Sequence, residues 1–120
     1  MDAAAVILVA LVALLHAWFV VLEMFLWNTP TGHVTFGLEP SFAEQSKSLA
    51  ANQGLYNGFI VAGLVYGLVG PDEHRYVFQV FFLVCVIVAG AYGGATVNKR
   101  ITLVQGLPAL LALAAVVAAH

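Results

Sequence analysis

Two side chains in this sequence could exchange a proton, namely the carboxyl group of Glu23 and the imidazole of His16. They are seven residues apart, so a helix would carry both on one face, two turns from each other. The stretch around them is otherwise apolar, and a carboxyl group in such a stretch needs a partner, a cavity or a function. We therefore predict that Glu23 and His16 form an acid–base pair at a catalytic site.

Amide and hydroxyl side chains in other apolar stretches could bind a substrate beside that pair. Gln53 and Asn57 are four residues apart and would form a stripe along one helix. The predicted substrate-binding residues are Asn52, Gln53, Asn57, Tyr92, Thr96 and Gln105. The alternative is that these groups only join helices through hydrogen bonds, as polar residues often do in membrane proteins. For His16 alone, the corresponding alternative is a hydrogen-bonded histidine in the core.

Several other chemistries lack the residues that they need. His33, His74 and His120 have no partner at a spacing typical of zinc ligands, so we expect no metal site. We also expect no cofactor, because the sequence has no glycine-rich phosphate loop and no nucleophile beside a base. Cys85 is the single cysteine, so it cannot form an intrachain disulfide. Only four residues are basic, which excludes an electrostatic surface for nucleic acid.

The elements that would position these residues are membrane-spanning helices. Hydrophobic residues make up 62% of the sequence and charged residues 8%, against roughly 45–50% and about 25% in ordinary globular proteins. A spanning helix needs about 20 mostly apolar residues. Four stretches meet this need: residues 3–27, 45–69, 76–97 and 101–119. Because short connections make neighbouring helices antiparallel, the sequence predicts an all-α fold, an integral membrane bundle of four antiparallel transmembrane helices in one domain, residues 1–120.

The connections between these helices predict how the multi-pass chain lies in the cell membrane. Lys47, Lys99 and Arg100 would lie on one side of the membrane and Arg75 on the other. Basic residues favour the cytoplasmic side, so both termini would lie outside. Most of the predicted site residues would then reach the cytoplasmic third of the bundle. We expect the connection 28–44 to be an ordinary loop, with a functional lid as the alternative.

Small residues and one proline predict how the helices pack. Glycines recur at four-residue spacing, as Gly54 and Gly58 on the second predicted helix and Gly90 and Gly94 on the third. Such faces let helix backbones approach closely, so we expect tight packing beside the polar residues. Pro108 should kink the fourth helix or free one of its backbone carbonyls.

Several stretches that together cover most of the chain share their residue pattern with known proteins. They are His16 with residues 23–27, and residues 34–38, 50–59, 89–93 and 104–110. The run Ala-Asn-Gln-Gly-Leu-Tyr-Asn-Gly, residues 51–58, is specific. In this pattern the sequence resembles a family of small bacterial membrane proteins catalogued as domain of unknown function 1304. The resemblance implies a four-helix fold in the bacterial inner membrane and brings no established activity with it.

Three functions fit these residues. The first is a polar site within the membrane, near the cytoplasmic side, which binds or converts an apolar small molecule. The second is proton-coupled transport or efflux by a homo-oligomer, in which Glu23 carries the proton. The third is a structural or accessory membrane subunit whose polar residues only join helices. The lipid bilayer is the predicted partner in all three.

Overall fold

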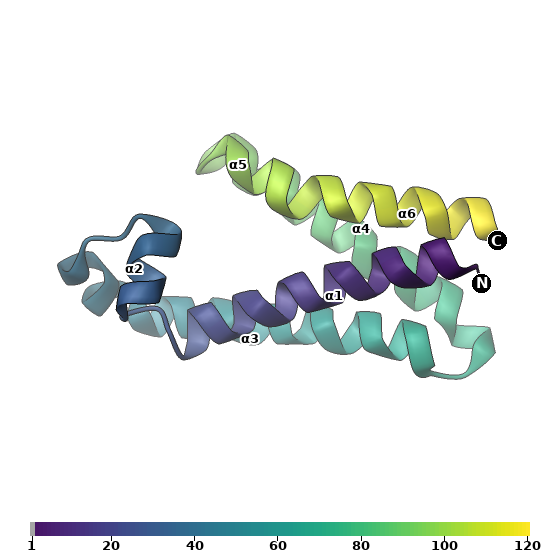
Figure 1. The fold of residues 1–120 in the computed structure, drawn as a ribbon, viewed down its shortest axis with the longest axis horizontal. Coiled ribbons are helices and arrows are strands. Elements are labelled where there is room, and N and C mark those ends of the chain that lie inside the picture. The colour runs from purple at the N-terminus through teal and green to yellow at the C-terminus, as the bar shows by residue number, and fades with distance from the viewer. Residues whose placement is uncertain (1) are drawn as a thin grey trace. The chain divides into compact units, whose positions relative to one another are not determined.

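A computed structural model describes residues 2–120 and shows only helices in that part of the chain. The elements are α1 (Ala3–Met24), α2 (Pro30–Phe36), α3 (Pro40–Val69), α4 (Asp72–Thr96), α5 (Lys99–Ile101), the π-helix η1 (Thr102–Gly106) and α6 (Leu107–Ala119) (Figure 1). The all-α class predicted from the sequence is confirmed.

Within residues 2–120, three helical segments are long and apolar enough to cross a membrane. They are Ala3–Met24, Asp72–Thr96 and Lys99–Ala119, the last of which combines α5, η1 and α6. At 30 residues α3 is longer than any of them. It differs because its first turns are polar and its middle carries amide side chains, which lower its hydropathy. Length and composition therefore support three of the four predicted spans.

The helices form two compact units. The first, here called the α4 unit, takes in the chain up to Ala13 together with Ala62–His120, and the second, the α2 unit, is Leu14–Val61. α1 and α3 each contribute residues to both. The α4 unit buries the aliphatic side chains of Ala5, Val9, Val12, Leu64, Leu83, Val86, Ala109, Ala112 and Val116. The α2 unit buries Leu22, Ala43 and Ala50 in the same way.

In the α2 unit, α1 and α3 approach each other closely at Gly54. A Cβ atom at Gly54 would lie 2.5 Å from Met24 Cγ and 3.1 Å from Glu23 Cβ, so a larger residue would force these atoms to move. This confirms the close packing expected there. At Gly58, one turn further along α3, an added Cβ atom would meet nothing within 4 Å. For Gly58 the expectation of tight packing is therefore wrong.

The connection after α1 is not an ordinary loop, because it contains α2. Thr29 caps this helix by accepting a hydrogen bond at Oγ1 from the N–H of Gly32, over 3.4 Å. Pro30 takes the first helical position, where its missing N–H has no partner to lose. Gly37 ends the helix in the left-handed conformation, with φ at 65°. The loop predicted for residues 28–44 is wrong over α2 and over the first turns of α3, which begins at Pro40.

In the α4 unit, the end of α3 packs against α4 around two glycines. Gln79 is fully buried and donates a hydrogen bond from Nε2 to the carbonyl oxygen of Gly67 over 2.6 Å. A Cβ atom at Gly67 would lie 2.9 Å from Gln79 Cγ, and one at Gly63 would collide with the ring of Phe82. The absent side chains on α3 thus make room for large side chains of α4.

α4 and the segment Lys99–Ala119 form a hairpin with very close backbone contact. A Cβ atom at Gly90 would lie 2.7 Å from the backbone nitrogen of Gly106. Thr102 donates from Oγ1 to the carbonyl oxygen of Gly90 over 2.8 Å. An added Cβ atom at Gly94 would collide with the Thr102 side chain. The tight packing predicted for the glycines of this helix is confirmed.

The helix predicted at residues 101–119 is interrupted by η1. The N–H of Leu107 donates to the carbonyl oxygen of Thr102, five residues earlier, which defines a π-helical turn. Pro108 follows directly and lies in the first turn of α6, where a missing N–H is tolerated. The disturbance predicted at Pro108 takes the form of this wider turn.

Candidate functional site

Glu23 and Asn57 form the centre of the candidate site, and both belong to the α2 unit. Asn57 Nδ2 on α3 donates a hydrogen bond to Glu23 Oε1 on α1 over 2.5 Å. Asn57 is 8% exposed, and Glu23 is half-buried. Because Gly54 has no side chain, α3 can come close enough to the last turn of α1 for this bond. One predicted catalytic residue thus contacts one predicted substrate-binding residue.

His16 lies two turns before Glu23 on the same continuous helix and is fully buried. Its ring meets the ring of Phe19 edge-on, with centroids 5.2 Å apart. Seven residues of α-helix separate His16 and Glu23 by about 10 Å along the axis. This separation is too long for direct proton transfer, so an exchange between them needs a bridging group or a ligand.

Asn52 and Gln53 are exposed on α3, although they stand close to Asn57 in the sequence. Neither shares the hydrogen bond between Asn57 and Glu23. Neither amide forms a hydrogen bond with the carboxyl group of Glu23 in the structure. Their part in substrate binding stays a prediction.

The remaining predicted binding residues belong to the α4 unit. Tyr92 is 72% exposed, and Thr96 donates from Oγ1 to the carbonyl oxygen of Tyr92 over 2.7 Å. That bond lies within α4 and joins no two helices. Gln105 is half-buried in η1, so a π-helical turn decides where its side chain points. The role of these three residues in binding stays a prediction.

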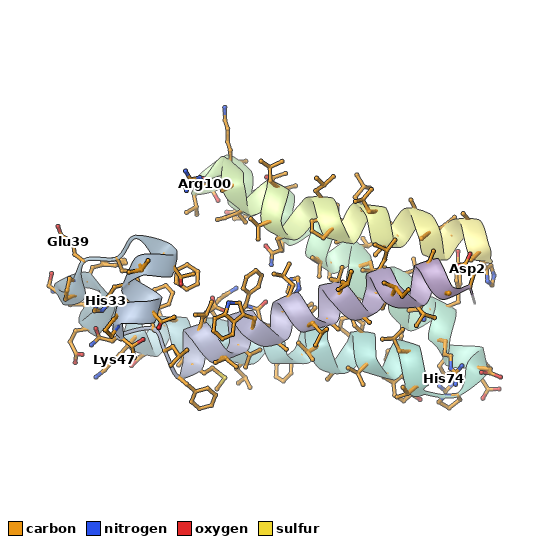
Figure 2. The ribbon with its side chains drawn as sticks, viewed as in Figure 1. Asp2, His33, Glu39, Lys47, His74 and Arg100 are labelled. Carbon is orange, nitrogen blue, oxygen red and sulfur yellow. The ribbon has the colours of Figure 1, made fainter. Side chains whose placement is uncertain are left out.

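The structure shows a polar network beside helix α2 that the sequence does not predict; its members are Asn28, His33, Glu44 and Lys47. Asn28 donates from Nδ2 to Glu44 Oε2 over 2.6 Å, and Lys47 donates from Nζ to Glu44 Oε1 over 2.8 Å. His33 Nε2 lies 2.9 Å from Asn28 Oδ1. Because Asn28 Oδ1 can only accept, Nε2 of His33 carries the proton in this contact. Figure 2 shows the labelled His33, Glu39 and Lys47 gathered in this region.

The electrostatics of this network centre on Glu44. The hydrogen bond from Lys47, and then the charge of Lys47, hold the pKa of Glu44 below its ordinary value. The spacing of Glu44 and Lys47, three residues on one helix, could have revealed their ion pair. The partner Asn28 could not have been found in this way, since it precedes Glu44 by 16 residues and lies before α2.

Trp27 ties the network to the end of α1. It donates from Nε1 to Ser46 Oγ over 3.0 Å, and its ring lies 4.9 Å from the ring of Phe36 in α2. An added Cβ atom at Gly32 would collide with the backbone carbonyl groups of Leu26 and Trp27. α2 is therefore packed against the residues that follow α1.

Gln79 is a buried polar residue that is also absent from the predicted site. The signal was available, because Gln79 interrupts an apolar run in the same manner as Gln105. An apolar groove of about 330 Å³ lies on the same helix, lined by Val77, Phe78, Phe81 and Phe82. None of the predicted site residues lines it. Residues 2–120 contain no group of three His, Cys, Asp or Glu side chains that could hold a metal ion.

Comparisons with known proteins agree with the resemblance seen in the sequence. A protein named "Uncharacterized protein YpaA" from Lactococcus lactis subsp. lactis (strain IL1403) is 36% identical over 110 residues, which cover 90% of this chain and 92% of the relative. No solved structure matches the chain. The family model described as "Protein of unknown function (DUF1304)" matches residues 10–117. Since this match covers most of the sequence, the chain belongs to the DUF1304 family.

Proposed function

We propose that this protein is an integral membrane protein of four antiparallel helices with a binding site for an apolar small molecule at Glu23 and Asn57. The hydrogen bond between these two side chains carries the proposal. It places a carboxyl group at the end of a helix that is apolar enough to cross a membrane. A carboxyl group at that position is costly unless it has a partner or a use.

In this proposal α3 is the fourth span, with its polar first turns outside the hydrocarbon. A helix of 30 residues measures about 45 Å, which matches the full bilayer with its headgroups. Lys47 lies in the first turns of α3, and Lys99 and Arg100 lie in α5; these basic residues favour the cytoplasm for their helix ends, and both termini would then lie outside. Asn57 lies near the middle of α3, so its bond to Glu23 would lie inside the membrane and not at its cytoplasmic surface.

The chemistry proposed for the site is binding, with proton exchange as a further step. Glu23 can accept a hydrogen bond from a ligand, and Asn57 holds its carboxyl group in one orientation. His16 lies two turns deeper on α1 and is fully buried, so a ligand at Glu23 could exchange a proton with it only after the surrounding side chains move.

A structural role is the second candidate, and the same hydrogen bond favours it. A single hydrogen bond between polar side chains, such as the one from Asn57 on α3 to Glu23 on α1, is enough to help join two membrane helices. In that case Glu23 and Asn57 would contribute to stability and would bind nothing.

An experiment on co-purified molecules separates the two candidates. The protein is purified in mild detergent and extracted, and the released molecules are compared by mass spectrometry between wild type, Glu23→Gln and Glu39→Gln. Glu39 is an exposed carboxylate between α2 and α3 and serves as the control. A binding site predicts a molecule retained at near-stoichiometric amounts by wild type and Glu39→Gln, and lost from a folded Glu23→Gln variant. No molecule that depends on Glu23, together with a lower unfolding midpoint in Glu23→Gln, would support the structural role.

A further inference from the structure

Only one of the two carboxylate oxygens of Glu23 has a hydrogen-bond partner within the part of the chain that the structure describes. Its Oε1 atom accepts the hydrogen bond from Asn57. Among residues 2–120, no ion pair reaches Glu23, and no second hydrogen bond reaches its carboxylate. Lys47, the one lysine of the α2 unit, is bound to Glu44 instead. One carboxylate oxygen of Glu23 is therefore available to a donor from outside the chain.

The partner that Glu23 has is neutral. An amide can orient a carboxylate, but it cannot balance its charge. A charged group within the membrane is stabilised by an opposite charge, and hydrogen bonds that involve two ions are about twice as strong as neutral ones. The ligand group that complements Glu23 best is therefore a cation with N–H donors.

Space for the rest of such a ligand lies next to Asn57. Gly58 follows Asn57 directly, and a side chain added there would meet no atom within 4 Å. Gly54, one turn earlier, is instead closed by Met24 and Glu23. The surface of α3 is thus tightly packed at Gly54 and open at Gly58, the residue after Asn57. A glycine with open space in front of it gives an apolar group direct access to the helix surface.

We propose that the ligand of this site is an amphipathic amine, whose ammonium group binds the second carboxylate oxygen of Glu23 and whose apolar body lies over Gly58. This inference rests on the proposed function and names its ligand class. Asn57 is a positioning residue, because it fixes the orientation of the carboxylate without touching the ammonium group. The apolar body remains in the hydrocarbon, where the exposed apolar surface of the helices already lies.

A matched pair of probes tests the ligand class. The protein in lipid nanodiscs is titrated with 2-(1-naphthyl)ethylamine and with 2-(1-naphthyl)ethanol, and the signal of protein-free nanodiscs is subtracted. The two probes share one apolar body and differ in the ammonium group. Saturable binding of the amine should be roughly tenfold tighter than that of the alcohol in wild type. In Glu23→Gln the two affinities should become equal within about twofold.

A second pair of variants tests the place of the apolar body. Gly58→Leu fills the open space and should weaken the binding of both probes by roughly tenfold, at an unfolding midpoint no lower than that of wild type. Phe59→Leu alters the exposed neighbouring side chain and should leave both affinities unchanged. Equal affinities of Gly58→Leu and wild type would overturn this placement.

The outcomes separate this inference from the proposed function. If the alcohol binds as tightly as the amine and still depends on Glu23, the site exists but is not specific for amines. If the amine binds equally well to Glu23→Gln, or neither probe binds saturably, the amine assignment is wrong. The proposed function itself fails only if purified wild type carries no molecule that depends on Glu23.

Discussion

Asn57 and Glu23 join α3 to α1 through one hydrogen bond of 2.5 Å, across 34 residues of sequence. The bond is possible because Gly54 lets the two helices approach. It gives the carboxyl group a fixed orientation and leaves one of its oxygens open. The stability of the α2 unit and the proposed binding therefore involve the same pair of side chains.

Replacing Asn57 should show what this bond contributes to stability. Asn57→Ala removes the donor and leaves Glu23 half-buried without a partner, so we expect a loss of about 1 kcal/mol in the free energy of unfolding. Gln53→Ala, one turn earlier on the exposed side of α3, should change it by less than about 0.5 kcal/mol. Unfolding by denaturant in mixed micelles measures both. Equal effects of the two substitutions would show that the bond has no net stabilising role.

The backbone contact between Gly90 and Gly106 predicts a strong effect of a single methyl group. Gly90→Ala places Cβ 2.7 Å from a backbone nitrogen that cannot move aside, so we expect a loss of about 1–3 kcal/mol. Gly58→Ala is the control, because its methyl group meets nothing within 4 Å. It should be neutral or stabilise the helix by roughly 0.5–1 kcal/mol. Thermal unfolding in detergent compares the two; a stable Gly90→Ala variant would contradict this packing.

Features that depend on the residues of a single helix are predicted well from the sequence. The all-α class, the apolar helices α1 and α4 and the close packing at Gly54 and Gly90 all follow from local composition and spacing. The sequence does not predict α2, because Pro30 is typical of a loop as well as of the first position of a helix, and in the structure it begins a helix.

The rest of the site depends on contacts between distant residues, which one sequence does not contain. From the sequence alone, Asn52, Gln53 and Asn57 on α3 are equally good candidates for a contact with Glu23. In the structure only Asn57 forms a hydrogen bond with it. The choice among them is made by the rotation of α3 against α1. That rotation depends on Gly54, whose missing side chain lets α3 approach α1 on one face. The identity of that face is known only when the two helices are packed together.

Substitutions of two threonines in the hairpin of α4 and Lys99–Ala119 should differ in their effect on stability. Thr102 Oγ1 bonds the carbonyl oxygen of Gly90 on another helix, so Thr102→Val should cost about 0.5–1.5 kcal/mol. Thr96 Oγ1 bonds Tyr92 within its own helix, so Thr96→Val should cost less than about 0.5 kcal/mol. Both changes keep the shape of the side chain. If Thr96→Val were the more damaging of the two in thermal unfolding, the role assigned to the Thr102 bond would be wrong.

The cap of α2 makes a prediction about local stability. Thr29→Ala removes the acceptor for the Gly32 N–H and the donor to the carbonyl oxygen of Leu26. We expect a local cost of about 0.5–2 kcal/mol, seen as roughly 2- to 30-fold faster hydrogen exchange of the α2 amides. Thr35→Ala is the control, since its hydroxyl bonds Thr31 inside α2. Unchanged exchange in Thr29→Ala would mean that α2 is held by its packing against Trp27 alone.

The ion pair of Glu44 and Lys47 makes the titration of Glu44 a test of the polar network. Lys47 lowers the pKa of Glu44 in the folded protein, so this group stabilises the fold above its unfolded pKa of about 4.3. The contribution is lost as the pH falls through the folded pKa, and it is small because both side chains are exposed. Lys47→Met should return the pKa of Glu44 towards its ordinary value, as measured by NMR titration of its carboxyl carbon. Asn28→Ala should raise it less, because the bond from Asn28 has a smaller influence than Lys47. Lys99→Met, in the other unit, is the control; a larger effect of Asn28→Ala than of Lys47→Met would show that the amide, and not the ion pair, governs this network.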